Sequence, residues 1–269
     1  MYKIIFILFF LVSSLFSKTI ITVTHPVQEY FIKKIAGKNV FVRTVFSKKK
    51  PYDPTNRKIV NKLSSARAYF TLGLEEENDV IKLLKAKNEE LVIINTTKGI
   101  GTLKLKNGKE NPYVWLDPLL AREFAMKIYG ELVKLRYYDR VKFKENLDLF
   151  LNELDKIYLD LKRKVDDSHL YGFFVFNNQL DYFAKRFRVD IYHKEYKLLH
   201  ISEVTNMIRF VRQEHIKHIV IPKNSDYRIA QSFSGHIDGK IVEYDIYDLN
   251  WKVNMFSLIR GITNFRIKQ

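Results

Sequence analysis

The sequence predicts an α/β protein with two lobes joined by one long helix. Short β-branched apolar runs alternate with amphipathic helical segments in both halves of the chain, an alternation typical of βαβ units and parallel sheets. Between the two alternating regions, the stretch from Pro118 to Lys164 contains no further proline and only one glycine, Gly130. The length left after an N-terminal leader, about 250 residues, suits two lobes of roughly 100 to 130 residues each.

The first lobe is predicted from its apolar runs and helical periods. Strands are expected at 20–24, 40–46, 69–72 and 91–94, and helices at 27–35, 57–65 and 78–85. Asp53, followed by Pro54 and Thr55, is expected to cap the second of these helices, because a carboxylate can accept the unpaired N–H groups at a helix start.

Two helices are predicted in the middle of the chain, with a break near Tyr138 and Asp139. The apolar residues from Phe143 to Leu161 recur with a helical period. The second helix is therefore expected to exceed about 20 residues, or roughly 30 Å, long enough to connect two lobes.

The second lobe resumes the alternation of strands and helices. Strands are expected at 173–176, 189–192, 219–221 and 240–244, and helices at 180–187, 202–212 and 251–265. The predicted organisation is a signal peptide at 1–17, an N-terminal α/β lobe at 18–117, a helical connector at 118–168 and a C-terminal α/β lobe at 169–269.

The N-terminus predicts export. Residues 1–17 combine Lys3, an apolar core and small residues before a cleavage position after Ser17, as in secretory signal peptides. The alternative, a membrane anchor, needs an apolar run of about 20 residues, and this one is shorter. The chain has no cysteine, which excludes disulfides, thiolate metal sites and a lipid-modified cysteine. A soluble periplasmic protein is expected.

The formal net charge is +16, but the basic residues are dispersed and no nucleic-acid-binding motif is present. Export also argues against nucleic acid as a partner. A basic solvated surface is expected, with attraction to anionic membrane faces as the functional alternative. We find no nucleophile elbow, phosphate loop or His-Glu-x-x-His motif, and so predict that the protein is not an enzyme.

Four segments resemble the substrate-binding proteins of zinc and manganese ABC importers, the ZnuA/TroA type. They are KPYDPT at 50–55, similar to H-x-Y-E-P-T; NPYVWLDP at 111–118, similar to D-P-H-x-W-L-D-P; VFNNQLDYFA at 175–184, similar to V-F-H-D-A-F-G-Y-F-A; and VEYDIY at 242–247, similar to a strand ending in D-P-L. The resemblance implies two α/β lobes on one long helix, with a ligand site between them.

Residue by residue, the resemblance places Lys50, Tyr113 and Asn177 where the family has histidines, and Asp245 where it has an acidic ligand. Only Asp245 is retained as a metal ligand. A zinc site normally takes four imidazole, thiolate or carboxylate ligands, so the set is degenerate. His25, which follows the first predicted strand, is the best candidate for a replacement ligand.

Several roles for these residues stay open. Lys50 either pairs with Asp245 or points into solvent from its loop. Tyr113 is expected to fill the volume of the lost metal, with its hydroxyl bonded to Asn177 or Asp245. Asn177 either lines the ligand site or serves local turn chemistry. His215 and His218 are expected at the surface.

The predicted function is the periplasmic solute-binding component of a zinc- or manganese-type ABC transporter, whose degenerate site binds metal weakly or through other ligands. The implied partner is an ABC permease in the inner membrane, with the binding protein a monomer. The only cofactor considered is a divalent metal ion, zinc or manganese. The alternative is a non-transporting scaffold or interaction protein of the same fold that has lost metal binding; a cationic surface adhesin is the third.

Overall fold

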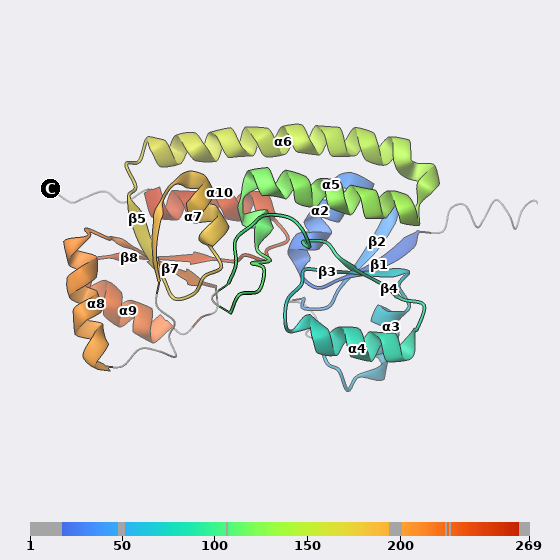
Figure 1. Ribbon diagram of the computed structural model, residues 1–269, viewed down its shortest axis with the longest axis horizontal. Coiled ribbons are helices and arrows are strands. Elements are labelled where there is room, and N and C mark those ends of the chain that lie inside the picture. The colour runs from blue at the N-terminus through green and yellow to red at the C-terminus, as the bar shows by residue number, and fades with distance from the viewer. Residues whose placement is uncertain are drawn as a thin grey trace, which may run out of the picture. The chain divides into compact units, whose positions relative to one another are not determined.

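The structure is a computed structural model that describes residues 18–47, 52–105, 107–193, 201–223, 225 and 227–263 (Figure 1). The chain forms two compact α/β units, and each contains one four-stranded parallel sheet. The first unit comprises Met1–Thr96 and Lys127–Leu147, and the second comprises Thr97–Met126 and Asp148–Gln269. This division differs from the expected boundary at 117, because residues 97–126 pack with the second unit.

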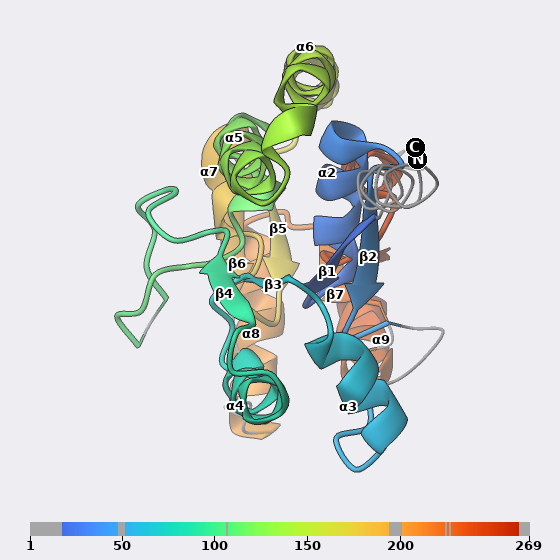
Figure 2. The ribbon, with the colours of Figure 1, turned by 90° about the vertical axis from the view of Figure 1, so that its right-hand side faces the viewer.

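The first unit has the strand order β2-β1-β3-β4, with all neighbours parallel. Helices α3 and α4 lie on one side of this sheet and α2 on the other (Figure 2). Side chains alternate between these faces along β1, so Thr22 turns toward α3 and donates a hydrogen bond to the Leu63 carbonyl at 2.8 Å. The elements are β1 (Thr19–Val23), α2 (Pro26–Ala36), β2 (Val40–Thr44), α3 (Arg57–Ser64), β3 (Ala68–Thr71), α4 (Glu77–Lys87) and β4 (Val92–Asn95).

The cap of α3 is a correction to the sequence prediction. Asn56, and not Asp53, caps this helix, because its side-chain oxygen accepts hydrogen bonds from the N–H groups of Lys58 and Ile59. Asp53 instead accepts from the backbone N–H of Thr55 at 2.9 Å and from the Thr55 hydroxyl at 2.7 Å. These bonds close a turn before the helix and lower the pKa of the Asp53 carboxyl.

The second unit has the strand order β6-β5-β7-β8, again with all neighbours parallel. Helix α9 was not predicted; it packs beside α8 (Figure 1) and contributes Ala230, Phe233 and Ile237 to the core below β5 and β7. The elements are η1 (Val114–Leu116), β5 (Gly172–Val175), α7 (Asp181–Phe187), β6 (Asp190–His193), α8 (Ile201–Gln213), β7 (His218–Pro222), α9 (Tyr227–Ile237), β8 (Lys240–Tyr244) and α10 (Trp251–Thr263).

The long helix is confirmed. Helix α5 (Pro118–Leu135) is followed by a short 3-10 turn, η2 (Tyr137–Asp139), at the predicted break, and then by α6 (Arg140–Asp166), which has 27 residues. At about 1.5 Å per residue, α6 is about 40 Å long. Its apolar stripe, which includes Phe143, Leu154 and Leu161, is fully buried. Within the described ranges, no helix is both long and apolar enough to span a bilayer.

His218 was expected at the surface, but it begins the buried strand β7 and is 5% exposed. Burial, aided by the nearby Lys240, lowers the pKa of its imidazole to about 4. An unfolded chain takes up this proton near pH 6.5, so the unfolded state is favoured as the pH falls from about 6.5 toward 4.

We therefore expect His218 to remove about 2 to 3 kcal/mol of stability between pH 7.5 and pH 4. Urea unfolding at a series of pH values should show a shallower acid loss in His218→Phe than in the wild type. Because both proteins share every other titrating group, the difference between their curves isolates His218. Parallel curves would contradict the prediction.

Candidate functional site

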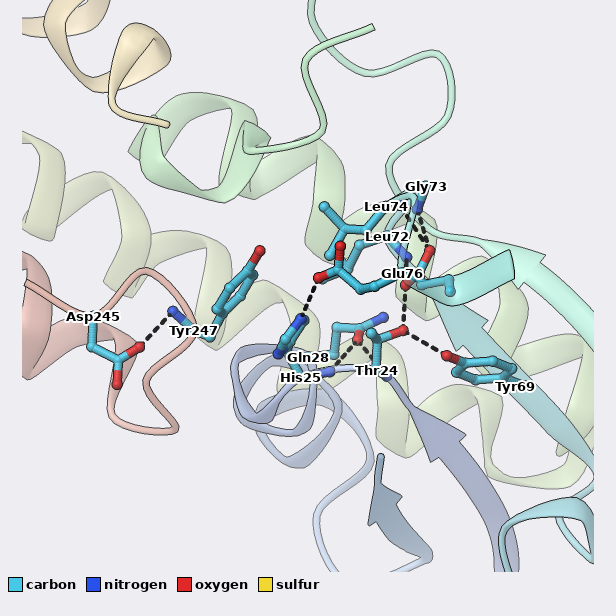
Figure 3. Close-up of polar contacts among 11 residues, drawn as sticks. Thr24, His25, Gln28, Tyr69, Leu72, Gly73, Leu74, Glu76, Asp245 and Tyr247 are labelled. Atoms are coloured by element: carbon cyan, nitrogen blue, oxygen red, sulfur yellow. Dashed lines mark hydrogen bonds and ion pairs between the residues drawn. The ribbon is translucent and has the colours of Figure 1, made fainter. Parts of the chain in front are cut away.

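Polar side chains gather where strands β1 and β3 of the first unit end. Ligand sites in parallel α/β sheets lie beyond the carboxyl ends of strands. Here Thr24 and His25 follow β1, and the loop after β3 leads to Glu76 (Figure 3) and then to Glu77, the first residue of α4.

His25 lies at the start of α2 and is 8% exposed. Its Nε2 atom lies 3.3 Å from Oε1 of Glu76, whose side chain is about half exposed. The hydrogen bond from His25 is the main reason that the pKa of the Glu76 carboxyl is lowered. The imidazole also packs on the ring of Phe46, with a centroid distance of 5.3 Å. The pair offers one nitrogen and one carboxylate donor, the two ligand types that divalent zinc accepts besides thiolate.

Glu77 is a buried carboxylate that holds the loop after β3. Its two oxygens accept hydrogen bonds from the backbone N–H groups of Leu72, Gly73 and Leu74 at 2.7 to 2.9 Å, and from the Thr24 hydroxyl (Figure 3). Burial nevertheless raises the pKa of this carboxyl, because loss of water outweighs the hydrogen bonds. Glu77 therefore shapes the loop that carries Glu76.

Gln28 performs a similar role at the end of β1. Its side-chain oxygen accepts from the backbone N–H groups of Thr24 and His25 at 2.9 and 3.1 Å, and its amide donates to the Phe70 carbonyl at 2.8 Å. The side chain is fully buried. Gln28 thus fixes the position of His25 relative to β3, in the manner of the N3 residue of a capping box.

Sequence reasoning missed both Glu77 and Gln28. A signal was present: Gln28 stands three residues after His25, the spacing of a capping box, and Glu77 opens a helix four residues after Gly73. Gly73 has a φ of +78°, and a Cβ there would lie 2.8 Å from the side chain of Asn95, so the turn needs glycine.

In the second unit, Asn177 serves the local turn and also contacts a neighbouring strand. Its Oδ1 atom accepts from the backbone N–H of Gln179 at 3.1 Å and from the Tyr244 hydroxyl at 3.2 Å. The same hydroxyl lies 2.9 Å from Oε1 of Gln179. The bond to Gln179 is local turn chemistry, one of the two roles left open for Asn177; a role in lining the ligand site stays a prediction. The residue that brings the ends of β5 and β8 together is Tyr244, which sequence reasoning did not single out.

Asp245 follows β8 and is partly buried. Its Oδ1 atom accepts from the backbone N–H of Tyr247 at 3.0 Å (Figure 3). The Asn254 side chain donates to its carbonyl at 2.7 Å and accepts from its N–H at 3.2 Å. The carboxylate is therefore held in a turn, and its role as a ligand stays a prediction.

Tyr113 lies half-buried just before η1, with its ring packed edge-on against Trp115 at 5.6 Å and tilted against Tyr247 at 6.5 Å. The Tyr113 ring and Asp245 are thus linked through Tyr247. Bonding of the Tyr113 hydroxyl to Asn177 or Asp245 stays a prediction.

The indole N–H groups of the two tryptophans of this unit connect three segments of the chain. The Trp115 indole donates to the Ile246 carbonyl, and the Trp251 indole donates to the Trp115 carbonyl, both at 2.8 Å. Both rings are buried. The segment before α5, the turn after β8 and the start of α10 are therefore tied into one block that carries Tyr113 and Asp245.

Asp117 caps α5, because its Oδ1 atom accepts a hydrogen bond from the backbone N–H of Leu119 at 2.8 Å. The same oxygen accepts from Nε of Arg186 at 2.6 Å. Asp117 is 4% exposed, so this ion pair is largely shielded from water. It raises the pKa of the Arg186 guanidinium and joins α7 to the start of α5.

Few side chains that could donate to a metal ion lie close together among the described residues. Within that part of the chain, no three His, Asp or Glu side chains cluster closely enough to hold a metal ion. Lys50 lies outside the described residues, so the proposed pairing of Lys50 with Asp245 stays a prediction. In the first unit, His25 and Glu76 bring one imidazole and one carboxylate into contact.

Comparison with known proteins gives one consistent result. The family model described as ZnuA, zinc-uptake complex component A, periplasmic, matches residues 21–249. A curated relative, the high-affinity zinc uptake system protein ZnuA of Buchnera aphidicola subsp. Schizaphis graminum, is 32% identical over 116 residues, which are 39% of this chain and 37% of the relative. That match therefore spans little more than a third of the relative's length.

Solved structures show the same fold along nearly the whole chain. A crystal structure of ZnuA superposes with a TM-score of 0.83 at 24% identity, covering 92% of this chain and 99% of that one. A cadmium-bound periplasmic metal-binding protein from Candidatus Liberibacter asiaticus gives 0.77 at 16% identity, covering 91% and 100%. The laminin-binding protein Lbp of Streptococcus pyogenes gives 0.75 at 18% identity, with the same coverage.

Proposed function

We propose a solute-binding role for this chain on one premise: the chain belongs to the ZnuA family, the periplasmic component A of the zinc-uptake complex. In this proposal the chain is exported to the periplasm, captures a solute and delivers it to an ABC permease in the inner membrane. The observation that carries the proposal is the family match over residues 21–249, supported by the two parallel α/β units. The metal, where one is bound, is the cargo.

We propose further that metal binding is weak and depends on His25 and Glu76 in the first unit. The support is their 3.3 Å contact at the carboxyl ends of the strands. Two donors satisfy only half of a four-coordinate zinc site, so water or other side chains must complete the shell. Manganese accepts more oxygen ligands, but a single carboxylate and one imidazole favour zinc.

The test is isothermal titration of chelator-stripped protein with zinc and with manganese, alongside a thermal melt that detects stabilisation by binding. Zinc is expected to bind with a Kd of about 1 to 100 μM and to raise the melting temperature by a few degrees. His25→Ala should weaken zinc binding about tenfold or more. The control His236→Ala removes an exposed imidazole from α9 of the second unit and should leave binding unchanged.

One observation favours the alternative, a scaffold or interaction protein of the same fold without metal transport. Within the described residues, no group of three metal donors is present. The alternative predicts no zinc or manganese binding at millimolar concentration and an unchanged melting temperature. A pulldown from periplasm, with and without added metal, would then separate a permease partner from a protein partner captured independently of metal.

The assignment of the family's ligand positions to Lys50, Tyr113 and Asn177 has its own test. If these positions correspond to the family histidines, the triple variant Lys50→His, Tyr113→His and Asn177→His should gain zinc binding at least tenfold tighter than the wild type. The double variant without Lys50→His should gain less, because each missing imidazole removes one ligand. No gain in the triple variant, with an intact fold by circular dichroism, would contradict the assignment.

A further inference from the structure

A second candidate binding site lies entirely within the second unit and includes the Asp117–Arg186 ion pair described above. A cavity of about 300 to 1,000 Å³ is typical of small-molecule sites, and this one measures about 710 Å³. It lies between the loop after β4, the start of α5, the C-terminal part of α6 and helix α7. Its basic lining comprises Lys162, Lys185, Arg186 and Arg188, and its acidic lining comprises Asp117 and Glu123.

Arg186 lines the cavity and is held there by two contacts. Its Nε atom donates to the shielded Asp117 carboxylate at 2.6 Å, and its guanidinium lies over the Tyr158 ring at 6.0 Å. Its side chain is 29% exposed. The terminal N–H groups of its guanidinium are not used in any hydrogen bond to a described residue, so they remain available to a ligand. An arginine fixed in this way loses little side-chain entropy when it binds a carboxylate or phosphate.

The loop on the other side of the cavity is fixed by close packing. Gly101 has a φ of +74°, and a Cβ there would lie 2.5 Å from the Tyr182 hydroxyl. The backbone N–H of Leu103 donates to the same hydroxyl at 3.1 Å. Thr102, between them, lines the cavity and adds a neutral hydroxyl. Helix α7 therefore holds this wall in place.

The charged side chains that line the cavity favour an anionic ligand. Asp117 is already neutralised by Arg186 and by the start of α5. Lys162 pairs with Asp166. Lys185 and Arg188 form no ion pair with a described residue, and both are exposed. Glu123 is the one acidic group of the lining without such compensation, so cationic groups dominate and a metal cation would be repelled.

We propose that this cavity binds a small oxyanion, a phosphate or carboxylate group, with Arg186 as the bidentate contact and Lys185 and Arg188 as flanking charges. This site is independent of the proposed metal binding, and its cargo or effector would be an anionic solute. Phosphate and carboxylate groups both present a pair of negatively charged oxygens. Inorganic phosphate is the probe for the first group, and citrate is the probe for the second.

The experiment is isothermal titration of the purified chain with inorganic phosphate and with citrate at constant ionic strength. The test variant is Lys185→Gln with Arg188→Asn, since Arg188 has a φ of +54° and asparagine tolerates the left-handed region. The control variant is Lys58→Gln with Lys82→Gln, which removes the same charge from exposed positions of the first unit. A second variant, Arg186→Gln, removes the bidentate contact.

Binding of either probe that weakens at least fivefold in the test variant, and less than twofold in the control, would support the site. Preference for phosphate or for citrate would distinguish the two sources. Equal weakening in both variants would assign the binding to general charge attraction and overturn the proposal. No binding of either probe at 10 mM, on the order of the weakest specific sites, would also overturn it. Neither result bears on zinc, which the titration above measures separately.

Discussion

Replacing Glu77 with alanine is expected to lower the free energy of unfolding of the first unit by about 4 kcal/mol. The substitution leaves three backbone N–H groups and the Thr24 hydroxyl without their acceptor. Each buried polar group left unsatisfied costs about 1 to 3 kcal/mol, and entry of water recovers part of the total. Urea denaturation followed by far-ultraviolet circular dichroism would measure the loss.

The neighbouring residue provides a matched control. Glu76→Ala removes the same functional group one position earlier, from a side chain that is about half exposed, and should cost less than about 1 kcal/mol. The stability loss in Glu77→Gln should lie between the losses in Glu76→Ala and Glu77→Ala. One oxygen is kept, but the NH₂ group that replaces the other cannot accept hydrogen bonds from the backbone N–H groups. Equal losses at both positions would contradict the role assigned to Glu77.

Replacing Trp115 with alanine is expected to lower the free energy of unfolding of the second unit by about 4 kcal/mol. The ring is fully buried, and removal of a buried tryptophan typically costs 3 to 5 kcal/mol. The Ile246 carbonyl also loses its donor. Trp115→Phe keeps most of the apolar contact but loses this hydrogen bond, and should cost about 2 kcal/mol.

Fluorescence makes this prediction convenient to test. The chain contains two tryptophans, so in either Trp115 variant the emission comes from Trp251 alone, which packs in the same unit. Urea unfolding monitored by that emission reports the stability of the second unit. If Trp115→Phe and Trp115→Ala lowered the free energy of unfolding equally, the loss would arise from the hydrogen bond and not from packing.

Much of the fold could be predicted because the apolar residues that recur at helix or strand spacing in the sequence are also the residues buried in the structure. The long helix, its break near Tyr138 and the strands of both sheets lie within a few residues of their expected positions. Helix α9 was missed because its Ser and Gly residues lower the helix propensity, although Ala230, Phe233 and Ile237 recur at helical spacing. Burial of these three side chains overrides the weak local preference.

The candidate site was harder to predict because it depends on contacts between distant segments. The resemblance indicated Asn177, but the Tyr244 hydroxyl that contacts it comes from another strand. His25 was selected as a possible ligand, but its partner Glu76 is 51 residues away in sequence. His218 was expected at the surface because it lies where a helix passes into a strand, whereas the sheet buries it.

Neither compact unit is a continuous stretch of sequence, because helices α5 and α6 each contribute residues to both. During synthesis, which adds about 5 to 20 residues per second, the first unit cannot be completed until Leu147 has been made. By then Thr97–Met126 have already been synthesised, but their packing partners in Asp148–Gln269 have not. A cut after Thr96 or after Leu147 would leave both fragments with unpartnered apolar surface. Folding of the two units is therefore coupled through the order of the chain itself, and cleavage inside α5 or α6 should impair both units.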